Sequence, residues 1–272
     1  MSVSIKLPAT ETLRLELSGS TLRIWLNRPD ARNALSDEMV AEFCQVLDAV
    51  RDERALRSIV IRGEGGIFCA GGDIKGFKNV MQGTMQADEV AASNRSFGDF
   101  MLKVNEQPQV VIMLVEGAAI GGGLGLSCIG DVTIATRDAR FRLSETSLGI
   151  PPAQIAPFVV ERIGLTQARR LMLTGARFNG EQALGYGLAH AVASNGDDLE
   201  QQCGEVLEQI SVCGAKANAI TKSILFETTR RPRPDALDFA SRGFAECMLG
   251  DEGREGIAAF VEKRSPAWSG KR

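Results

Sequence analysis

The sequence predicts an α/β fold with parallel strands, on three observations. Two apolar runs rich in β-branched residues, 58–62 and 110–115, have the length and composition of buried strands. A helical pattern precedes each of them, at residues 36–52 and 93–107, so the strands are joined by crossover helices, which are right-handed in parallel sheets. A glycine-rich loop follows each run. Ligands of such sheets bind beyond the carboxyl ends of the strands, where both loops would lie.

The first hundred residues supply the outer strands and the first helices. Residues 12–26 alternate apolar and polar side chains around Gly19-Ser20, which predicts two strands joined by a turn. Ser36 before Asp37 and Glu38 is typical of a helix N-terminus. Residues 76–92, polar and rich in Met and Gln, are expected to form a mobile helix or lid.

The second half of the chain is mainly helical. Pro151-Pro152 precede helical patterns, and the Arg/Pro-rich segment 230–234 marks a change in helix direction. The remaining expected elements are helices at 154–162, 166–174, 178–183, 198–212, 214–228 and 235–262, and a short strand at 188–192.

Charge and hydropathy exclude several classes of protein. The 272 residues carry a net charge of −3 without a long basic run, so we expect no nucleic-acid partner. No apolar segment reaches the ~20 residues of a membrane span, and the N-terminal stretch lacks the apolar region of a signal peptide. We therefore expect a cytoplasmic protein with no membrane partner.

Cysteine and histidine usage argues against a metal centre. The six cysteines are scattered without paired spacing, which indicates reduced core thiols. His190 is the single histidine and is expected to be a surface or packing residue, so neither a zinc site nor a Ser-His-Asp triad is expected.

The triple glycine and a glutamate that follows it form a candidate catalytic site. Gly121-Gly122-Gly123 lie between an apolar strand and a small-residue helix expected to begin at Leu124, so their N–H groups favour negative charge. About twenty residues on, Glu145 stands among small and apolar residues. Backbone N–H groups stabilise an oxyanion, and a carboxylate beside it moves protons. The alternative is a tightly packed glycine site with an ordinary surface glutamate.

Five segments of the chain follow one another in an order and at spacings that form a recognisable pattern. They are LNRPDARNAL (26–35), FCAGGDIK (68–75), EGAAIGGGLGLSCIGDVTIA (116–135), FRLSETSLGI (141–150) and REGIAAFVEKRSP (254–266). Together they resemble the enoyl-CoA hydratase/isomerase, or crotonase, superfamily. Within it, residues 151–175 are similar to isohexenylglutaconyl-CoA hydratases, relatives of the methylglutaconyl-CoA hydratases.

The resemblance implies a fold and an assembly. Residues 1–200 would form a ββα spiral core with the active site, and residues 201–272 a helical oligomerisation region. The protein would be a homotrimer or a hexamer of two trimers. An acyl-CoA thioester would place its carbonyl oxygen between the N–H groups of Gly72 and Gly122, with Glu145 as acid/base. No metal and no cofactor beyond the CoA moiety of the substrate is implied.

The same resemblance assigns a CoA site. Ala31, Ala70, Asp73 and Ile74, with Lys75, would border the adenine and pantetheine of CoA. Candidates for its phosphates are Arg28, Arg32, Lys75 and Lys263, and each of these is alternatively a solvated surface charge.

One departure from the family pattern leaves the reaction open. Typical hydratases carry two glutamates, and the first position is Gly125 here. A single Glu145 suits a Δ3-Δ2 enoyl-CoA isomerase, whereas hydration requires it both to activate water and to protonate the α-carbon, with Gln154 or Ser144 as a candidate for orienting the water. Gly125 would alternatively make room for a branched acyl chain, whose second carboxylate would need a basic partner. A third reading is a non-catalytic scaffold. The candidate basic partners are Arg142, Arg140 and Lys78.

Overall fold

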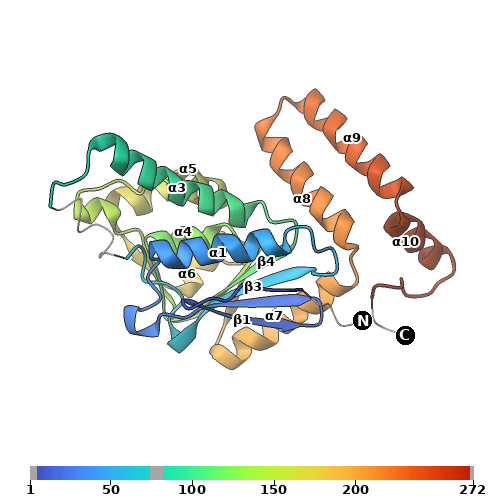
Figure 1. The fold of residues 1–272 in the computed structure, drawn as a ribbon, viewed down its shortest axis with the longest axis horizontal. Coiled ribbons are helices and arrows are strands. Elements are labelled where there is room, and N and C mark those ends of the chain that lie inside the picture. Colours follow the sequence, from blue (N-terminus) through green and yellow to red (C-terminus); the bar gives the residue numbers. More distant parts are fainter. Residues whose placement is uncertain (1–4, 74–81, 270–272) are drawn as a thin grey trace.

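The computed structural model describes residues 5–73 and 82–269 (Figure 1). A six-stranded sheet has the order β1-β2-β3-β4-β6-β9, in which β1 pairs antiparallel with β2 and every other neighbouring pair is parallel. The predicted α/β class is therefore confirmed. The strands are β1 (Leu13–Ser18), β2 (Thr21–Leu26), β3 (Ser58–Gly63), β4 (Val110–Val115), β6 (Val132–Thr136) and β9 (Ala191–Ala193).

A second sheet of three short strands was not anticipated. It has the order β5-β7-β8, and its strands are β5 (Ala118–Ile120), β7 (Arg140–Arg142) and β8 (Arg177–Phe178). Strand β5 lies between β4 and the triple glycine, in the segment expected to be a glycine-rich loop. Phe178 belongs to β8 rather than to the helix expected at 178–183, which begins at Gly180 with Asn179 as its cap.

Helices cover both faces of the main sheet. The helices among the described residues are α1 (Asp37–Val50), α3 (Ala87–Asn105), α4 (Gly122–Cys128), α5 (Ala156–Thr174), α6 (Gly180–Gly185), α7 (Gly196–Ser211), α8 (Ala215–Arg230), α9 (Arg233–Leu249) and α10 (Asp251–Val261). Ser36 caps α1, because its side chain accepts a hydrogen bond from the Met39 N–H. Gly164, at φ +73°, interrupts α5 where the sequence predicts a break between two helical segments.

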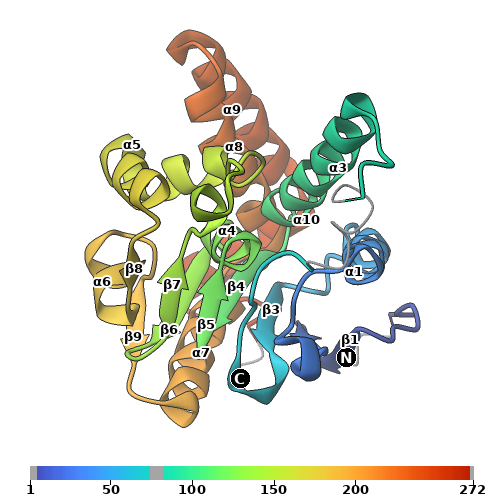
Figure 2. The same ribbon diagram turned by 90° about the vertical axis from the view of Figure 1, so that its left-hand side faces the viewer.

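Alternation along the strands builds two apolar layers. Ile59 and Ile61 of β3 face the cluster that includes α1, α3, α4 and α5, whereas Val60 faces the cluster that includes α7. Figures 1 and 2 show α1, α3, α4 and α5 on one side of the main sheet and α7 on the other. This two-faced burial explains why β3 and β4 read as continuous apolar runs in the sequence.

The last three helices stand apart from the sheet. Helices α8 and α9 form an antiparallel hairpin, and α10 follows at the lower end of α9, beside the start of α8 (Figure 1). Pro232 caps α9, so the Arg/Pro-rich segment changes the direction of the chain as predicted. The division expected between residues 200 and 201 falls inside α7, which packs on the sheet; the division into two regions stays a prediction.

Several details differ from the sequence-based expectations. Residues 87–92 belong to α3, and residues 76–81 of the expected lid lie outside the described residues. Of the six thiols expected in the core, Cys69, Cys128 and Cys203 are buried, whereas Cys213 is exposed. No helix in the described part of the chain is long and apolar enough to span a membrane.

Candidate active site

The two glycine-rich loops meet at one edge of the core. The first loop follows β3 and runs beside β5, with the Cys69 N–H donating to the Ala118 carbonyl at 2.9 Å. The Ile120 N–H returns a bond to the Cys69 carbonyl at 3.0 Å. These backbone bonds bring Gly71-Gly72 and Gly121-Gly122 together, although fifty residues separate them in the sequence.

Gly72 presents its own N–H to the site. The Leu35 N–H donates to the Gly71 carbonyl at 2.8 Å, and the Asp73 N–H donates to the Leu35 carbonyl at 3.0 Å. Leu35 is hydrogen-bonded to the residues before and after Gly72, as in a parallel β-bridge. The N–H of Gly72 therefore points away from Leu35. Gly72 is exposed, and the N–H finds no acceptor within the described residues.

Gly122 supplies a second N–H close by. It is the first residue of α4, where helical N–H groups have no partner within the helix. A Cβ atom built on Gly122 would stand 3.8 Å from the Gly72 nitrogen, and one built on Gly71 would stand 3.8 Å from the Gly122 nitrogen. In the part of the chain that the structure describes, no acceptor is found for the Gly122 N–H either. Two such donors side by side can hold an oxyanion.

Glu145 lies against the residue before Gly122. It begins a 3-10 helix, Glu145–Leu148, and its Oε1 atom is 2.7 Å from the position that a Cβ on Gly121 would occupy. Gly121 has φ +52° and donates its N–H to the Arg142 carbonyl at 2.8 Å, which joins β7 to the start of α4. The carboxylate therefore depends on a bare glycine for its place.

The environment of Glu145 suits proton transfer. Its Oε2 atom is buried and finds no hydrogen-bond partner in the described residues. Burial raises the pKa of this carboxyl above its ordinary value, and backbone hydrogen bonds offset part of that rise. A half-buried carboxylate with a raised pKa and an unpaired oxygen is an arrangement typical of a general acid/base.

The space beside Gly125 is filled. A Cβ on Gly125 would overlap Ile155, standing 2.7 Å from its Cβ and closer still to its Cγ2, and 3.4 Å from Met101 Cε. Ile155 and Met101 are buried. Gly125 therefore does not open room for a larger acyl chain at this point, contrary to the sequence-based alternative.

The other polar candidates are already engaged. Gln154 donates to Asn94 of α3 at 3.0 Å and lies over Gly98. Arg142 donates to the Gly175 carbonyl at 3.0 Å, and the exposed Arg140 approaches the Gly117 carbonyl at 3.4 Å. Lys78 lies outside the described residues.

The candidate CoA residues divide into two groups. Ala31 and Ala70 lie in adjacent loops, because the Ala70 N–H donates to the Arg32 carbonyl at 3.0 Å. Arg28 forms an ion pair with Asp73 at 2.8 Å and donates to the Ala34 carbonyl, so its guanidinium holds this loop together. Ile74 and Lys75 lie outside the described residues, as part of the gap at 74–81.

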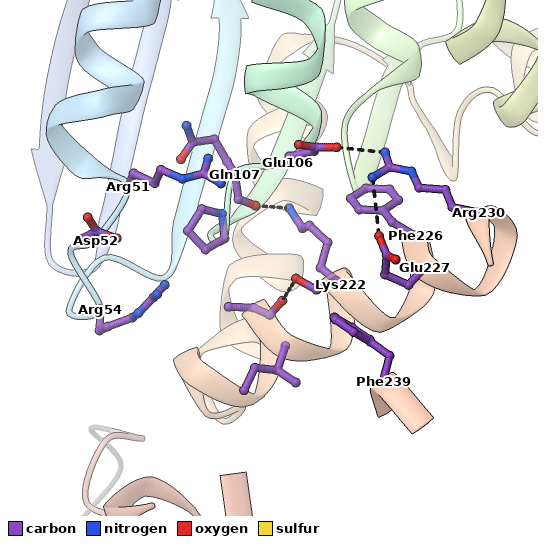
Figure 3. A pocket seen from close by; sticks show the side chains of 14 residues that line it. Arg51, Asp52, Arg54, Glu106, Gln107, Lys222, Phe226, Glu227, Arg230 and Phe239 are labelled. Atoms are coloured by element: carbon purple, nitrogen blue, oxygen red, sulfur yellow. Dashed lines mark hydrogen bonds and ion pairs between the residues drawn. The ribbon is translucent and has the colours of Figure 1, made fainter. Parts of the chain in front are cut away.

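A separate cavity of about 360 Å³ lies between the core and the α8–α9 hairpin (Figure 3). Lys222 reaches from α8 to the carbonyls of Gln107 and Gln109, at 2.8 and 2.7 Å, and pairs with Asp131 at 2.5 Å. None of the residues assigned to the glycine site from the sequence lines this cavity, so we place the candidate active site elsewhere, at the glycine loops.

No metal centre is found among residues 5–73 and 82–269, where no group of three or more His, Cys, Asp or Glu side chains could hold an ion. His190 accepts a hydrogen bond at Nδ1 from the Thr133 N–H, at 2.9 Å, which is a structural contact between β6 and the segment before β9.

Two residues of the site were missed from the sequence. Gly121 was noted only as part of a glycine run, and its positive φ is visible only in three dimensions. Ile155 reads as an ordinary apolar residue before a helix, and no sequence signal pairs it with Gly125.

Comparisons with known proteins identify the family of the chain. The profile of the enoyl-CoA hydratase/isomerase family matches residues 16–271. The solved structure of Pseudomonas aeruginosa AtuE is 52% identical, with a TM-score of 0.92 over 95% of this chain and 100% of that one. An enoyl-CoA hydratase/isomerase from Marinobacter aquaeolei is 44% identical, with a TM-score of 0.91 over 95% and 99%. Enoyl-CoA hydratase EchA19 of Mycobacterium tuberculosis is 34% identical over 93% of this chain and 94% of its own. The chain belongs to the enoyl-CoA hydratase/isomerase family and has the crotonase fold.

Proposed function

We propose that the protein is an enoyl-CoA hydratase acting on a branched or carboxylated 2-enoyl-CoA, of the isohexenylglutaconyl-CoA or 3-methylglutaconyl-CoA type. The observation that carries this proposal is the half-buried carboxylate of Glu145, held against Gly121 beside two backbone N–H groups without acceptors. The substrate class rests on the resemblance of residues 151–175.

The proposed chemistry uses three groups. The N–H groups of Gly72 and Gly122 hold the thioester oxygen, and each such donor is worth roughly 3 kcal/mol of barrier lowering. The oxygen of water bonds to the β-carbon while Glu145 takes one of its protons, which gives the enolate. The same carboxyl then returns the proton to the α-carbon, so one water is added and Glu145 ends ionised. The thioester supplies the acidity, and neither a metal nor a redox cofactor is needed.

The CoA moiety would lie along the first loop. We propose Ala31, Ala70 and Asp73, with Ile74 and Lys75, as its border. Since Arg28 is already paired with Asp73, Arg32, Lys75 and Lys263 are the better candidates for its phosphates.

A Δ3-Δ2 enoyl-CoA isomerase is the second candidate. It is favoured by Gly125 and by the way Ile155 fills the space beside it, because only one carboxylate is available. In that reaction Glu145 would remove a proton from the α-carbon of a 3-enoyl-CoA and return it to the γ-carbon, with no net addition.

One experiment separates the two reactions. The protein is incubated in H₂¹⁸O with crotonyl-CoA, 3-methylglutaconyl-CoA, isohexenylglutaconyl-CoA and a 3-enoyl-CoA, and the products are analysed by mass. Heavy oxygen at the β-carbon supports hydration. A 2-enoyl product without added mass, formed only from the 3-enoyl substrate, supports the isomerase. Turnover of none of them, with Glu145→Gln as the blank, contradicts both.

We also propose assembly through α8–α10 as a homotrimer or a hexamer. Large apolar side chains on these helices are exposed in the single chain, which is unusual unless a surface is covered. Light scattering on the parent and on Phe260→Asp tests this proposal, since a monomeric parent contradicts it. The exposed side chains are Leu225, Leu237, Phe244, Met248, Leu249, Ile257, Phe260 and Val261.

A further inference from the structure

We propose that Ile155 is a positioning residue that restricts the site to one carboxylate, because its side chain occupies the place where a second acid/base would stand. The inference rests on the proposed acyl-CoA chemistry and goes beyond it, since it names the residue that decides how many groups take part in proton transfer. Glu145 is the carboxylate that remains.

Helix α4 sets the geometry. The Gly125 N–H donates to the Gly121 carbonyl at 3.0 Å, so the two glycines lie one helical turn apart on the same face of α4. The carboxylate of Glu145 covers the Gly121 position, and the side chain of Ile155 covers the Gly125 position. A carboxylate on residue 125 would therefore project beside that of Glu145, into the volume that Ile155 fills.

The obstructing atom is the Cβ of Ile155, which is bonded directly to the backbone and does not move when the side chain changes rotamer. The Cβ of Ile155 itself would be 2.7 Å from a Cβ on residue 125, a distance that real Cβ contacts do not reach. Met101, the other neighbour, touches this position only with its terminal Cε at 3.4 Å, and a methionine end can move. Ile155 is 3% exposed and has no open space into which to retreat.

This geometry makes a sharp distinction among replacements of Ile155. Valine and alanine keep the obstructing Cβ, so they should still exclude a side chain at residue 125. Only glycine removes it. Backbone strain does not oppose this change, since Ile155 has φ −90° and ψ −20°, which glycine adopts freely.

The first test is a thermal-unfolding cycle on the full chain. We expect Gly125→Glu to lower Tm by about 5–10 °C through overpacking. Adding Ile155→Ala or Ile155→Val to Gly125→Glu should leave the protein as unstable as Gly125→Glu alone. Gly125→Glu/Ile155→Gly should melt no lower than Ile155→Gly alone. A parental Tm for Gly125→Glu, or equal losses with glycine and alanine at residue 155, overturns the inference.

The second test reads the chemistry. In Gly125→Glu/Ile155→Gly, two neighbouring carboxylates should share a proton, so the pH profile of kcat for crotonyl-CoA hydration should gain a second ionisation absent from Ile155→Gly. Hydration should rise ~10-fold or more over Ile155→Gly. A folded double variant with one ionisation and an unchanged rate overturns the role of Ile155.

The two proposals fail in different ways. If neither the parent nor any variant converts an enoyl-CoA, the proposed function fails. The catalytic role of Ile155 then fails as well, whereas the steric exclusion of a side chain at residue 125 is still judged by the melting cycle, independently of any activity.

Discussion

The carboxylate of Glu145 lies against the backbone of Gly121, with Oε1 2.7 Å from the position that a Cβ on that glycine would take. The same glycine has φ +52°, and its N–H is bonded to the Arg142 carbonyl. One residue thus places the carboxylate and also sets the start of α4, from which the next residue, Gly122, offers its N–H.

Gly121→Ala should therefore disable the site. The methyl group would collide with Oε1 and strain a left-handed backbone, so the carboxylate must leave its position. We expect turnover of the preferred enoyl-CoA to fall ~10²-fold or more, the usual contribution of a general acid/base. Gly185→Ala is the matched control, because that glycine is helical and has open space around it. Parental kinetics in Gly121→Ala would rule out the placement of Glu145 described above.

Replacing Glu145 by Gln should raise stability while lowering activity. Burial raises the pKa of Glu145, so the folded state binds its proton more tightly than the unfolded state does. Below the pKa of the unfolded state, near 4.5, Glu145 is protonated in both states and burial costs the parent no stability. As pH rises through the higher pKa of the folded state, the carboxyl must ionise while buried, and the parent loses stability. Tm of Glu145→Gln minus Tm of the parent should therefore be near zero at acid pH and positive at pH 7–8.

The activity of the parent should follow the same ionisation. If Glu145 acts first as a base, kcat/KM falls as pH drops through its raised pKa, at a higher pH than for an ordinary glutamate. A Glu145→Gln protein that retains parental turnover, or one that is less stable than the parent at pH 8, would contradict these expectations.

The proposed oxyanion donors can be tested by substitutions at two neighbouring glycines. A Cβ on Gly122 would meet Phe97 and Leu35 at 3.4 and 3.5 Å, so Gly122→Ala should fold. Its methyl would stand 3.8 Å from the Gly72 nitrogen, where the proposed function places the thioester oxygen, so kcat should fall by roughly 10²-fold or more. Gly123→Ala, whose Cβ would stand 2.7 Å from the Cys69 Cβ, should instead lose stability. Unfolding of Gly122→Ala, or full activity in it, contradicts the assignment.

The sequence predicted what depends on local pattern. Helix α1 follows from the Ser36 cap and its apolar face, and β3 and β4 follow from apolar runs buried on both faces. Strands β5, β7 and β8 have two or three residues each, too short for a period, and exist because they pair with one another. The relation between Gly125 and Ile155 joins positions thirty residues apart through tertiary packing, which no local pattern encodes.

Lys222 is a buried cation that connects α8 to the core. It pairs with Asp131 at 2.5 Å and donates to the carbonyls of Gln107 and Gln109, just before β4, and burial lowers its pKa. Lys222→Met keeps the apolar stem but leaves Asp131 without its cation, so the free energy of unfolding should fall by about 3 kcal/mol. Adding Asp131→Asn should recover part of that loss, because the uncompensated charge is then gone. Chemical denaturation of Lys222→Met, Asp131→Asn and the double variant measures the coupling between the two residues. Independent, additive losses would show that the pair does not stabilise this junction.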